Sequence, residues 1–282
     1  MSSVKELKVR LVGVETIQKI TRAMKMVSAA RLRTLQRVIN QVVVGMKIFP
    51  SFFQGDAKLS NEKTRFLLPI SSERGLCGSV NTSINKSIMY SLNDLHQRSV
   101  DTEVFIIGQK SRDFFLRNCG NSIIRQIDQM SPNNVNFVTA SLSVEELLYN
   151  KFDQVSIFFN LCESVVSQRV YSFHVKSFSL AQKDFPQVLA NELDDATEDI
   201  NALYSDLYQF GLVFLFIYVL IQSKTAEQAS RVSAMENATK NAGEIIQTLR
   251  LVYNKARQSA ITRELIEIIS CANALTGSSR RE

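Results

Sequence analysis

The segment Arg74, Gly75, Leu76, Cys77, Gly78 is the first place where residue types in this chain could do chemistry. It follows a short apolar run and precedes a helical pattern, and a glycine turn at a helix N-terminus can hold a phosphate. The glycine spacing matches neither GxGxxG nor GxxxxGK[ST], and no lysine follows where it would reach a phosphate. A tight strand-to-helix turn is therefore the favoured interpretation. Cys77 beside Arg74 could be an activated thiol, but a small packed cysteine is the preferred reading.

The other reactive side chains form no catalytic or metal-binding constellation. His174 has no His, Cys or acidic companion at ligand spacing, so a solvated or locally hydrogen-bonded histidine is expected. The acidic run 192–199 lacks the loop glycine and the ligand order of an EF-hand, and is expected to be a solvated linker. The four cysteines form no CxxC pair and are expected to be independent, reduced thiols. The sequence thus predicts no enzyme activity and no cofactor.

The positive charge is concentrated at the N-terminus. Residues 1–40 carry nine basic and two acidic side chains, whereas the other 242 residues are close to neutral. Such a segment suits an acidic protein surface, an anionic membrane or nucleic acid. Nucleic-acid binding is disfavoured, because no aromatic residue precedes Phe49 and no known motif is present. A transit peptide is also disfavoured, because the pattern continues to residue 40.

Both ends of the chain show long helical patterns. Near the N-terminus, apolar residues recur at steps of three and four, which predicts a narrow seam that supercoils with a partner helix: Val4, Leu7, Leu11, Val14, Ile17, Ile20, Met24 and Val27. Leu35, Val38 and Val42 continue this seam toward Pro50. Near the C-terminus, a pattern without proline runs from 203 to 275, with a seam at Ile245, Leu249, Val252 and Ala256 that Leu265, Ile266 and Ile269 continue. An antiparallel pair formed by the two ends is the simplest closure.

The middle of the chain alternates strand and helix patterns. Strands are expected at 66–70, 104–107, 155–159 and 170–178, and helices at 81–95 and 111–117. This order indicates βαβ crossovers and a parallel or mixed sheet. The predicted fold class is therefore α/β, with a long antiparallel coiled coil of the terminal helices and a small Rossmann-like domain between them. The expected boundaries are 1–58, 59–190, an acidic linker at 191–202, and 203–282.

The longest apolar run, 210–221, is 12 residues long. A bilayer-crossing helix needs roughly 20 residues. No membrane span is therefore expected.

Four separated segments carry a family resemblance. They read TIQKITRAMKMVSA (16–29), SERGLCG (72–78), EQASRVSAMENATKNA (227–242) and VYNKARQSAITRELIEII (252–269). In this order and spacing they resemble the gamma subunits of the F-type ATP synthases, over essentially the whole chain. The resemblance implies a non-catalytic rotor of the central stalk, which transmits torque between a proton-driven c-ring and a catalytic alpha/beta hexamer. It also implies delta/epsilon-type stalk subunits as partners, and a peripheral position at the membrane.

The matching motifs imply contact residues. Arg257 and Gln258 correspond to a catch on the beta subunits, and Lys86 to a second catch. Met24 and Lys25 lie in the segment that faces acidic loops of the beta subunits. For each of them, an ordinary exposed or seam residue is the alternative.

Two departures from the family pattern bear on the lower stalk. Glu73 replaces an aspartate of the central turn, and could still cap that turn. The stretch 210–221 is almost wholly apolar where the family is commonly polar, and Gln222 stands at the position of a glutamate. We expect a partner subunit with an apolar face to cover this foot surface at Phe214, Tyr218 and Gln222. No cysteine pair lies in 181–203, so thiol regulation of rotation is not expected.

Other functional classes remain as alternatives. One is a nucleotide-binding or nucleic-acid-binding α/β domain with basic coiled-coil arms, and another is a basic tether to nucleic acid or membrane. The motifs AMKMV and ITRELIEII are closer to mitochondrial than to many bacterial members of the family. They favour the matrix side of the mitochondrial inner membrane over the cytoplasmic face of a bacterial membrane.

Overall fold

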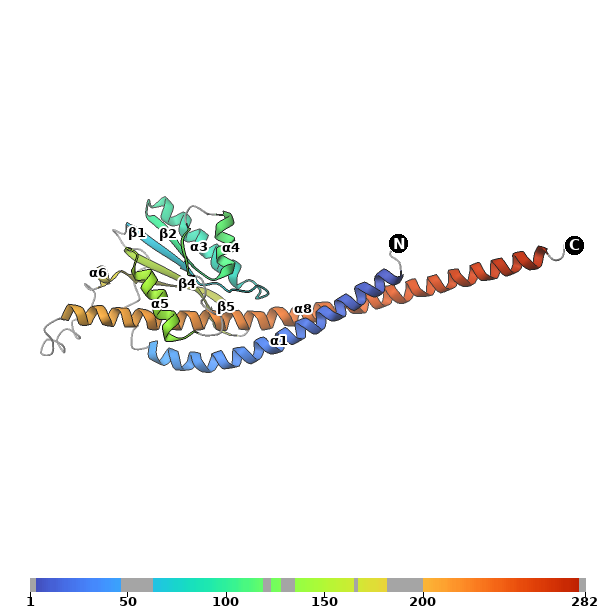
Figure 1. Cartoon of the computed structure of the whole chain (residues 1–282), viewed down its shortest axis with the longest axis horizontal. Coiled ribbons are helices and arrows are strands. Elements are labelled where there is room, and N and C mark those ends of the chain that lie inside the picture. The colour runs from blue at the N-terminus through green and yellow to red at the C-terminus, as the bar shows by residue number, and fades with distance from the viewer. Residues whose placement is uncertain are drawn as a thin grey trace. The chain divides into compact units, whose positions relative to one another are not determined.

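The computed structural model describes residues 4–46, 63–118, 123–127, 135–164, 167–181 and 200–278. The elements in these ranges are labelled in Figure 1. In chain order they are α1 (Val4–Met46), β1 (Thr64–Pro69), α3 (Val80–Gln97), β2 (Asp101–Ile107), α4 (Gln109–Asn118), β3 (Ile123–Ile127), α5 (Phe137–Leu148), β4 (Gln154–Cys162), β5 (Gln168–Lys176), α6 (Phe178–Ala181) and α8 (Ile200–Ser278). The predicted turn after Pro50, Cys119 and nearly all of the acidic linker lie outside the described residues.

The strands form one mixed sheet in the order β3-β2-β1-β4-β5. Parallel pairing joins β1 to β2, β1 to β4 and β2 to β3, and β5 runs antiparallel to β4. The four predicted strands and both predicted helices are present, so the predicted mixed α/β fold is confirmed. The patterns missed β3, α5 and α6, whose sequences are too short or too mixed in period to stand out.

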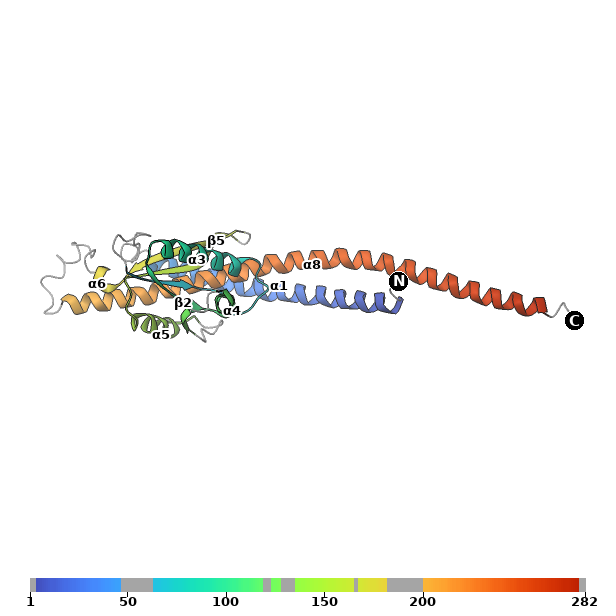
Figure 2. The same cartoon turned by 90° about the horizontal axis from the view of Figure 1, so that it is seen from above.

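The sheet has an apolar core on each face. On one face, Phe66, Leu68 and Phe105 pack with residues of α5 and α8. On the other, Leu67, Val104 and Ile106 pack with residues of α3 and α4. Figures 1 and 2 show these helices on the sheet. Because the central strands are buried on both faces, their sequences are continuous apolar runs and do not alternate.

The chain forms two compact units, and the division cuts through both long helices. One unit, the paired-helix unit, comprises Met1–Met26 and Met235–Glu282. The other, the sheet unit, comprises Val27–Ala234. The expected boundaries followed changes in sequence pattern. The units differ from them because the early part of α8 belongs to the core of the sheet, so helix ends and unit boundaries do not coincide.

Within the paired-helix unit, α1 and α8 pair in antiparallel fashion, as predicted. Thr21 Oγ1 lies 2.8 Å from Thr239 Oγ1, and an Arg250 guanidinium nitrogen lies 2.7 Å from a carboxylate oxygen of Glu15. As residue numbers fall along α1, the numbers of the partners rise along α8, which defines the antiparallel direction.

The predicted seam of α1 is correct at its start and at Met24, and its predicted continuation, Leu35, Val38 and Val42, is half-buried. Ile17, Ile20 and Val27 were expected in the seam, but they are 54%, 53% and 54% exposed. Seven of the covered positions keep strict alternate steps of three and four: Val4, Leu7, Leu11, Val14, Gln18, Thr21 and Lys25. Glu15 and Met24, beside this line, are also half-buried. A left-handed pair needs this 3.5-residue average, so geometry selects these positions even where they are polar.

Hydrogen bonds make the polar seam residues compatible with burial. Gln18 Nε2 donates to the carbonyl oxygen of Thr239 at 3.4 Å, beside the contact between the two threonine hydroxyls. A Cβ at Gly243 would lie 3.1 Å from Gln18 Nε2, so glycine leaves space for this amide. In α8, Leu249 and Ala256 are half-buried as predicted, but Ile245 and Val252 are about half exposed. Here too the apolar pattern alone gave the wrong register.

Within the described residues, α8 is long and apolar enough to cross a membrane by length and composition. Its most apolar window has a mean hydropathy of 1.6, and 56% of that window is buried inside the protein. The sequence predicted no span. Leu212, Phe216 and Val219 of the apolar stretch are fully buried in the sheet core, which is the behaviour of a core helix.

A glycine joins β2 to α4 in a conformation that other residues rarely adopt. Gly108 has φ +101°, and a Cβ there would overlap the carbonyl oxygen of Ser71. The backbone N–H of Ser71 donates to the carbonyl of Ile107 at 2.9 Å, which fixes this close approach. The contact sets the distance between the chain after β1 and the chain after β2.

We expect Gly108→Ala to lower the free energy of unfolding by at least about 2 kcal/mol, from backbone strain together with overlap. Gly75→Ala is the matched control, because a Cβ at Gly75 meets only Lys110 Cε at 3.8 Å. Urea denaturation of both variants measures the difference. Equal midpoints for the two variants would contradict this account.

His174 is a locally hydrogen-bonded histidine, one of the two forms predicted. Its Nδ1 lies 2.9 Å from Ser156 Oγ, and its Nε2 lies 3.2 Å from Ser172 Oγ. Burial, and secondly the charge of Arg65, lower the pKa of His174 to about 4. The ring is therefore neutral in the folded protein at neutral pH.

The lowered pKa of His174 predicts a loss of stability in acid. An unfolded histidine has a pKa near 6.5, so between about pH 6.5 and pH 4 only the unfolded chain binds this proton. Stability should fall as the pH falls through this window, by up to about 1.4 kcal/mol per pH unit. His174→Gln should reduce this slope in urea unfolding curves, whereas His96→Gln, at an exposed position, should keep it. A slope unchanged in His174→Gln would exclude the assignment.

Candidate partner-contact surface

The residues predicted to contact a hexamer do not form one cluster. Met24 and Lys25 lie in α1, and Arg257 and Gln258 lie in α8 of the same unit. Lys25 is level with Glu236 of α8, since their charged atoms are 3.2 Å apart. Arg257 lies 21 residues farther along α8, roughly 30 Å at 1.5 Å per residue. The helix pair therefore presents two separate levels for contact. Lys86 is exposed on α3 in the sheet unit.

Arg257 and Gln258 are both exposed, next to the half-buried Ala256. Within the described part of the chain, no hydrogen bond or ion pair engages the side chain of either residue. The main-chain carbonyl of Gln258 accepts from Thr262 Oγ1 at 2.9 Å. An exposed guanidinium and an adjacent amide on a rigid helix can donate to carbonyl or carboxylate oxygens of a partner. Lys25 differs, because Glu236 already pairs with it in this chain. Met24 is half-buried.

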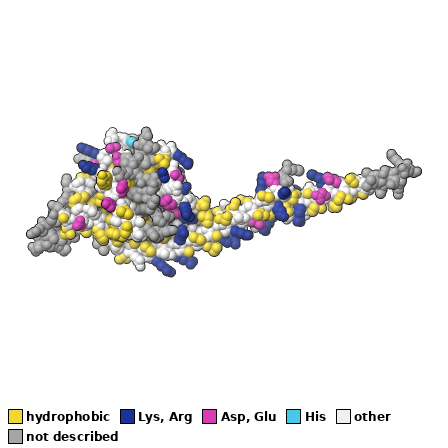
Figure 3. Space-filling view, viewed as in Figure 1, with side chains coloured by type: hydrophobic (Ala, Val, Ile, Leu, Met, Phe, Trp, Pro, Cys, Tyr) yellow, Lys and Arg dark blue, Asp and Glu magenta, His cyan; other side chains and the backbone are white. Residues whose placement is uncertain are grey.

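The paired-helix unit exposes many large apolar side chains. On α1 these are Val9, Val12, Ile17, Ile20 and Met26, and on α8 they are Ile245, Leu251, Val252, Ile261, Leu265, Ile266, Ile268 and Ile269. On the face seen in Figure 3, hydrophobic and basic side chains are interspersed along the paired helices. Single exposed apolar side chains are normal on soluble proteins, but this many on one helix pair make the pair a candidate interface.

The last part of α8 has no helix beside it within the described residues. Continuing the observed pairing places Val4, the first described residue of α1, near Ala260 of α8. Ala260 is also the last half-buried position, and every described side chain from 261 to 273 is exposed. The predicted seam residues Leu265, Ile266 and Ile269 are therefore exposed, with no helix against them among the described residues. A single helix in water has little to stabilise it, so this segment is a candidate contact surface for a partner.

The expected basic surface is present on α1. Of the nine bases in residues 1–40, all except Lys25 are exposed. Some are partly neutralised within the paired-helix unit, since Arg10 pairs with Glu6 at 2.7 Å. Exposed bases such as Lys5, Lys19 and Arg22 remain available to acidic groups of a partner.

The predicted foot residues pack mainly against this chain's own sheet unit. Tyr218 lies in T-shaped contact with Phe159 and Phe173, at centroid distances of 6.4 and 6.2 Å. Burial raises the pKa of Tyr218. A Cβ at Gly45 would overlap the ring of Phe214, so this glycine lets α1 approach α8 within the unit. Gln222 is buried and donates to the Tyr218 hydroxyl at 3.3 Å. The apolar composition of 210–221 is therefore explained largely without a partner, and partner contact there stays a prediction.

The glycine turn at 74–78 is a tight structural turn, as expected. The thiol of Cys77 is buried, and it accepts from Asn81 Nδ2 at 3.2 Å. Leu76 and Gly78 both have positive φ angles, 62° and 63°. Ser230 of α8 donates to the carbonyl of Cys77 at 2.7 Å, which anchors the turn to the helix. The carbonyl groups of the turn are thus used inside the protein.

No group of three or more His, Cys, Asp or Glu side chains that could hold a metal ion occurs among the described residues. Cys77, Cys162 and Cys271 are free thiols, in agreement with the sequence prediction. Sequence reasoning missed the exposed apolar register of the helix pair. The strict three-four spacing could have revealed it, because that spacing leaves Ile17, Ile20 and Val27 outside the seam.

Comparison with known proteins agrees with this geometry. A family described as ATP synthase matches residues 3–275. The mitochondrial ATP synthase subunit gamma of Drosophila melanogaster is 36% identical over 283 residues, covering 98% of this chain and 92% of the relative. The ATP synthase gamma chain of Roseobacter denitrificans is 34% identical over 293 residues, covering 98% of this chain and 100% of the relative.

Solved structures share the fold. A chain in the mitochondrial ATP synthase of Euglena gracilis, in an assembly of OSCP, F1 and c-ring, matches with a TM-score of 0.81 at 21% identity, covering 98% of this chain and 95% of that one. A chain from the central stalk and c-ring of the Tetrahymena thermophila enzyme matches with a TM-score of 0.62 at 24% identity, covering 78% and 99%. The sequence matches span nearly the full length of both the chain and its relatives, and the chain belongs to the ATP synthase family, among its gamma chains.

Proposed function

We propose that this chain is the rotor of the central stalk in an F-type ATP synthase, with no active site of its own. The observation that carries the proposal is the set of exposed apolar and basic side chains on both helices of the paired-helix unit. The two helices pack against each other along their seam, but they leave apolar side chains exposed on the outside. A partner that encloses the pair would bury these side chains. A ring of alternating alpha and beta subunits supplies such an enclosure on all sides.

The mechanism follows from unequal contacts. A shaft that presents Arg257, Gln258 and its apolar residues on different sides meets each of three equivalent subunits differently. Only a difference in contact free energy between conformations can shift their populations. Rotation of the shaft then changes the nucleotide affinity of each catalytic site in turn, and by reciprocity nucleotide turnover drives the shaft.

Weak contacts suit a turning surface. Exposed ion pairs contribute about 0–1 kcal/mol each, so they form and break during rotation without trapping one position. The exposed bases of α1 can make such ion pairs with acidic loops of the beta subunits. Met24 and Lys25 lie in the segment of α1 that would face these loops. Lys86 on α3 would act as a second catch.

The remaining partners are inferred for the sheet unit. We infer that delta/epsilon-type stalk subunits and the c-ring bind there, and that Phe214, Tyr218 and Gln222 belong to this foot region. We place the assembly on the matrix side of the mitochondrial inner membrane, since mitochondrial relatives are among the similar proteins. Bacterial gamma chains are similarly close in sequence, so the cytoplasmic face of a bacterial membrane is the alternative.

Copurification tests the proposed function. A tagged full-length chain expressed in its own cells should bring down alpha and beta subunits in a complex with ATPase activity. In the same complex, Tyr218 should be protected from hydroxyl-radical modification relative to the isolated chain if a partner covers the foot. Recovery of the chain alone, or with nucleic acid as its main companion, would exclude the rotor assignment.

We expect Arg257→Ala combined with Gln258→Ala to lower the ATPase rate of the assembled complex about two- to fivefold. This corresponds to losing up to about 1 kcal/mol of contact free energy in the favoured state. The unfolding midpoint of the isolated chain should not change, because both side chains are exposed. Arg117→Ala, at an exposed basic position of α4 to which no partner contact is assigned, is the control and should leave the rate near wild type. Equal losses in both variants would indicate a general charge effect.

A further inference from the structure

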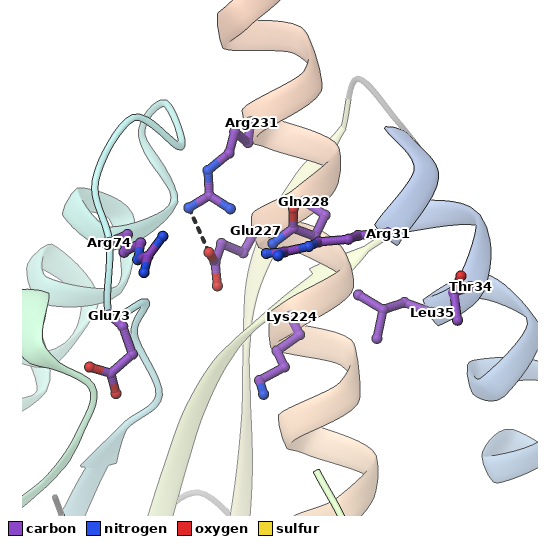
Figure 4. A pocket seen from close by; sticks show the side chains of 9 residues that line it. All are labelled: Arg31, Thr34, Leu35, Glu73, Arg74, Lys224, Glu227, Gln228 and Arg231. Atoms are coloured by element: carbon purple, nitrogen blue, oxygen red, sulfur yellow. Dashed lines mark hydrogen bonds and ion pairs between the residues drawn. The ribbon is translucent and has the colours of Figure 1, made fainter. Parts of the chain in front are cut away.

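A pocket of about 340 Å³ lies within the sheet unit and has basic side chains on three of its sides. Figure 4 shows Arg31 entering from α1, Arg74 from the turn after β1, and Lys224 and Arg231 from α8. Two acidic side chains, Glu73 and Glu227, also line it. Small-molecule sites begin at about 300 Å³, so the volume suits a small ligand.

One charge pair belongs to the wall of the pocket. A guanidinium nitrogen of Arg231 lies 2.6 Å from Glu227, and the two side chains are only 9% and 16% exposed. The same Arg231 nitrogen donates to the carbonyl of Gly75 at 3.3 Å, which holds the turn against α8. This pair is neutral overall, and its hydrogen bonds are occupied inside the protein.

The guanidinium groups of Arg31 and Arg74, unlike that of Arg231, have no carboxylate paired with them among the described residues. Neither Arg31 nor Arg74 makes a side-chain hydrogen bond or ion pair with any residue that the structure describes. Both are exposed, and in Figure 4 they reach toward Glu227 from opposite sides. Each carries a fork of N–H donors that fits two oxygens of one anion.

Lys224 supplies a third cation to the same space. Its burial lowers the pKa to about 8, although Glu227 and Glu73 act in the opposite direction. Burial disfavours the charged form of an ammonium group. A bound anion would therefore favour the charged form of Lys224.

Among the described residues that line the pocket, four bases and two acids leave an excess of two positive charges, which a dianion would balance. We propose that this pocket binds the phosphate group of a small soluble ligand, with Arg31 and Arg74 as bidentate donors and Lys224 as the third positive contact. Guanidinium forks bind phosphate oxygens with short, charge-assisted hydrogen bonds. The mode differs from a phosphate-binding glycine loop, because side chains and not the turn's N–H groups make the contacts.

Such a ligand would join three segments that are distant in sequence. Arg31 comes from α1, Arg74 from the turn, and Lys224 from α8. A ligand that binds only the folded state raises its stability with concentration. Binding should therefore raise the melting temperature of the full chain as well as give a heat of association.

Isothermal titration of the isolated full-length chain with inorganic pyrophosphate tests the proposal, and the absence of catalytic subunits removes their nucleotide sites from the measurement. Arg31→Gln and Arg74→Gln should each weaken binding about tenfold or more, the range expected for loss of a charged hydrogen bond. Arg33→Gln on α1 and Arg117→Gln on α4 are matched controls, because both are exposed and do not line the pocket. They should change the dissociation constant less than twofold.

Two further arms identify the ligand and the third cation. If ADP binds more tightly than pyrophosphate, the ligand that supplies the phosphate group is a nucleotide. If ADP binds equally or more weakly, the ligand is a free phosphate. At pH 9, binding should take up protons in the wild type but not in Lys224→Met, as shown by heats in buffers of different ionisation enthalpy. Arg31→Lys, which keeps the charge but not the fork, should bind between wild type and Arg31→Gln. Absence of binding, or equal weakening by the two control variants, would overturn the proposal.

Discussion

The antiparallel contact between α1 and α8 is the interaction on which the rest of this molecule depends. In the paired-helix unit no sheet supports either helix, so each helix is stabilised by burying a narrow seam against the other. A seam with alternate steps of three and four is the only one that stays on the contact line of two supercoiled helices. Polar residues at those positions are retained because they bond across the pair, as Thr21 and Thr239 do.

This choice of seam gives the pair its outer surface. With Gln18, Thr21 and Lys25 inside or half inside, Ile17 and Ile20 are left outside. A helix pair optimised for itself would show the reverse arrangement. An interior that mixes apolar residues such as Leu7 with polar ones such as Thr21, beneath an outer surface with exposed isoleucines, is consistent with a shaft whose outer contacts belong to other subunits.

In the sheet unit, α8 is buried to a greater extent than in the paired-helix unit. There α8 is covered by α5 and the sheet, and residues such as Leu212 and Phe216 are fully buried. The apolar stretch that suggested a partner-covered foot is therefore chiefly core. The turn at 74–78 is joined to this part of α8 through Ser230 and Arg231, so the strand-to-helix turn and the long helix form one supported structure. The basic pocket lies at that junction, where α1 adds Arg31.

The sequence by itself determined the element types, the mixed α/β class, the antiparallel closure and the family. Continuous apolar runs such as 66–70 identify strands, and four spaced motifs identify the gamma chains. Its apolar pattern alone did not show which residues face inward, because Ile17 is apolar and exposed whereas Thr21 is polar and buried. Supercoil geometry decided the register of the seam, and the packing of α8 on the sheet decided the foot. The joining of Arg31, Arg74 and Lys224 around one pocket was also decided only by tertiary structure, because their separation in sequence gives no sign of it.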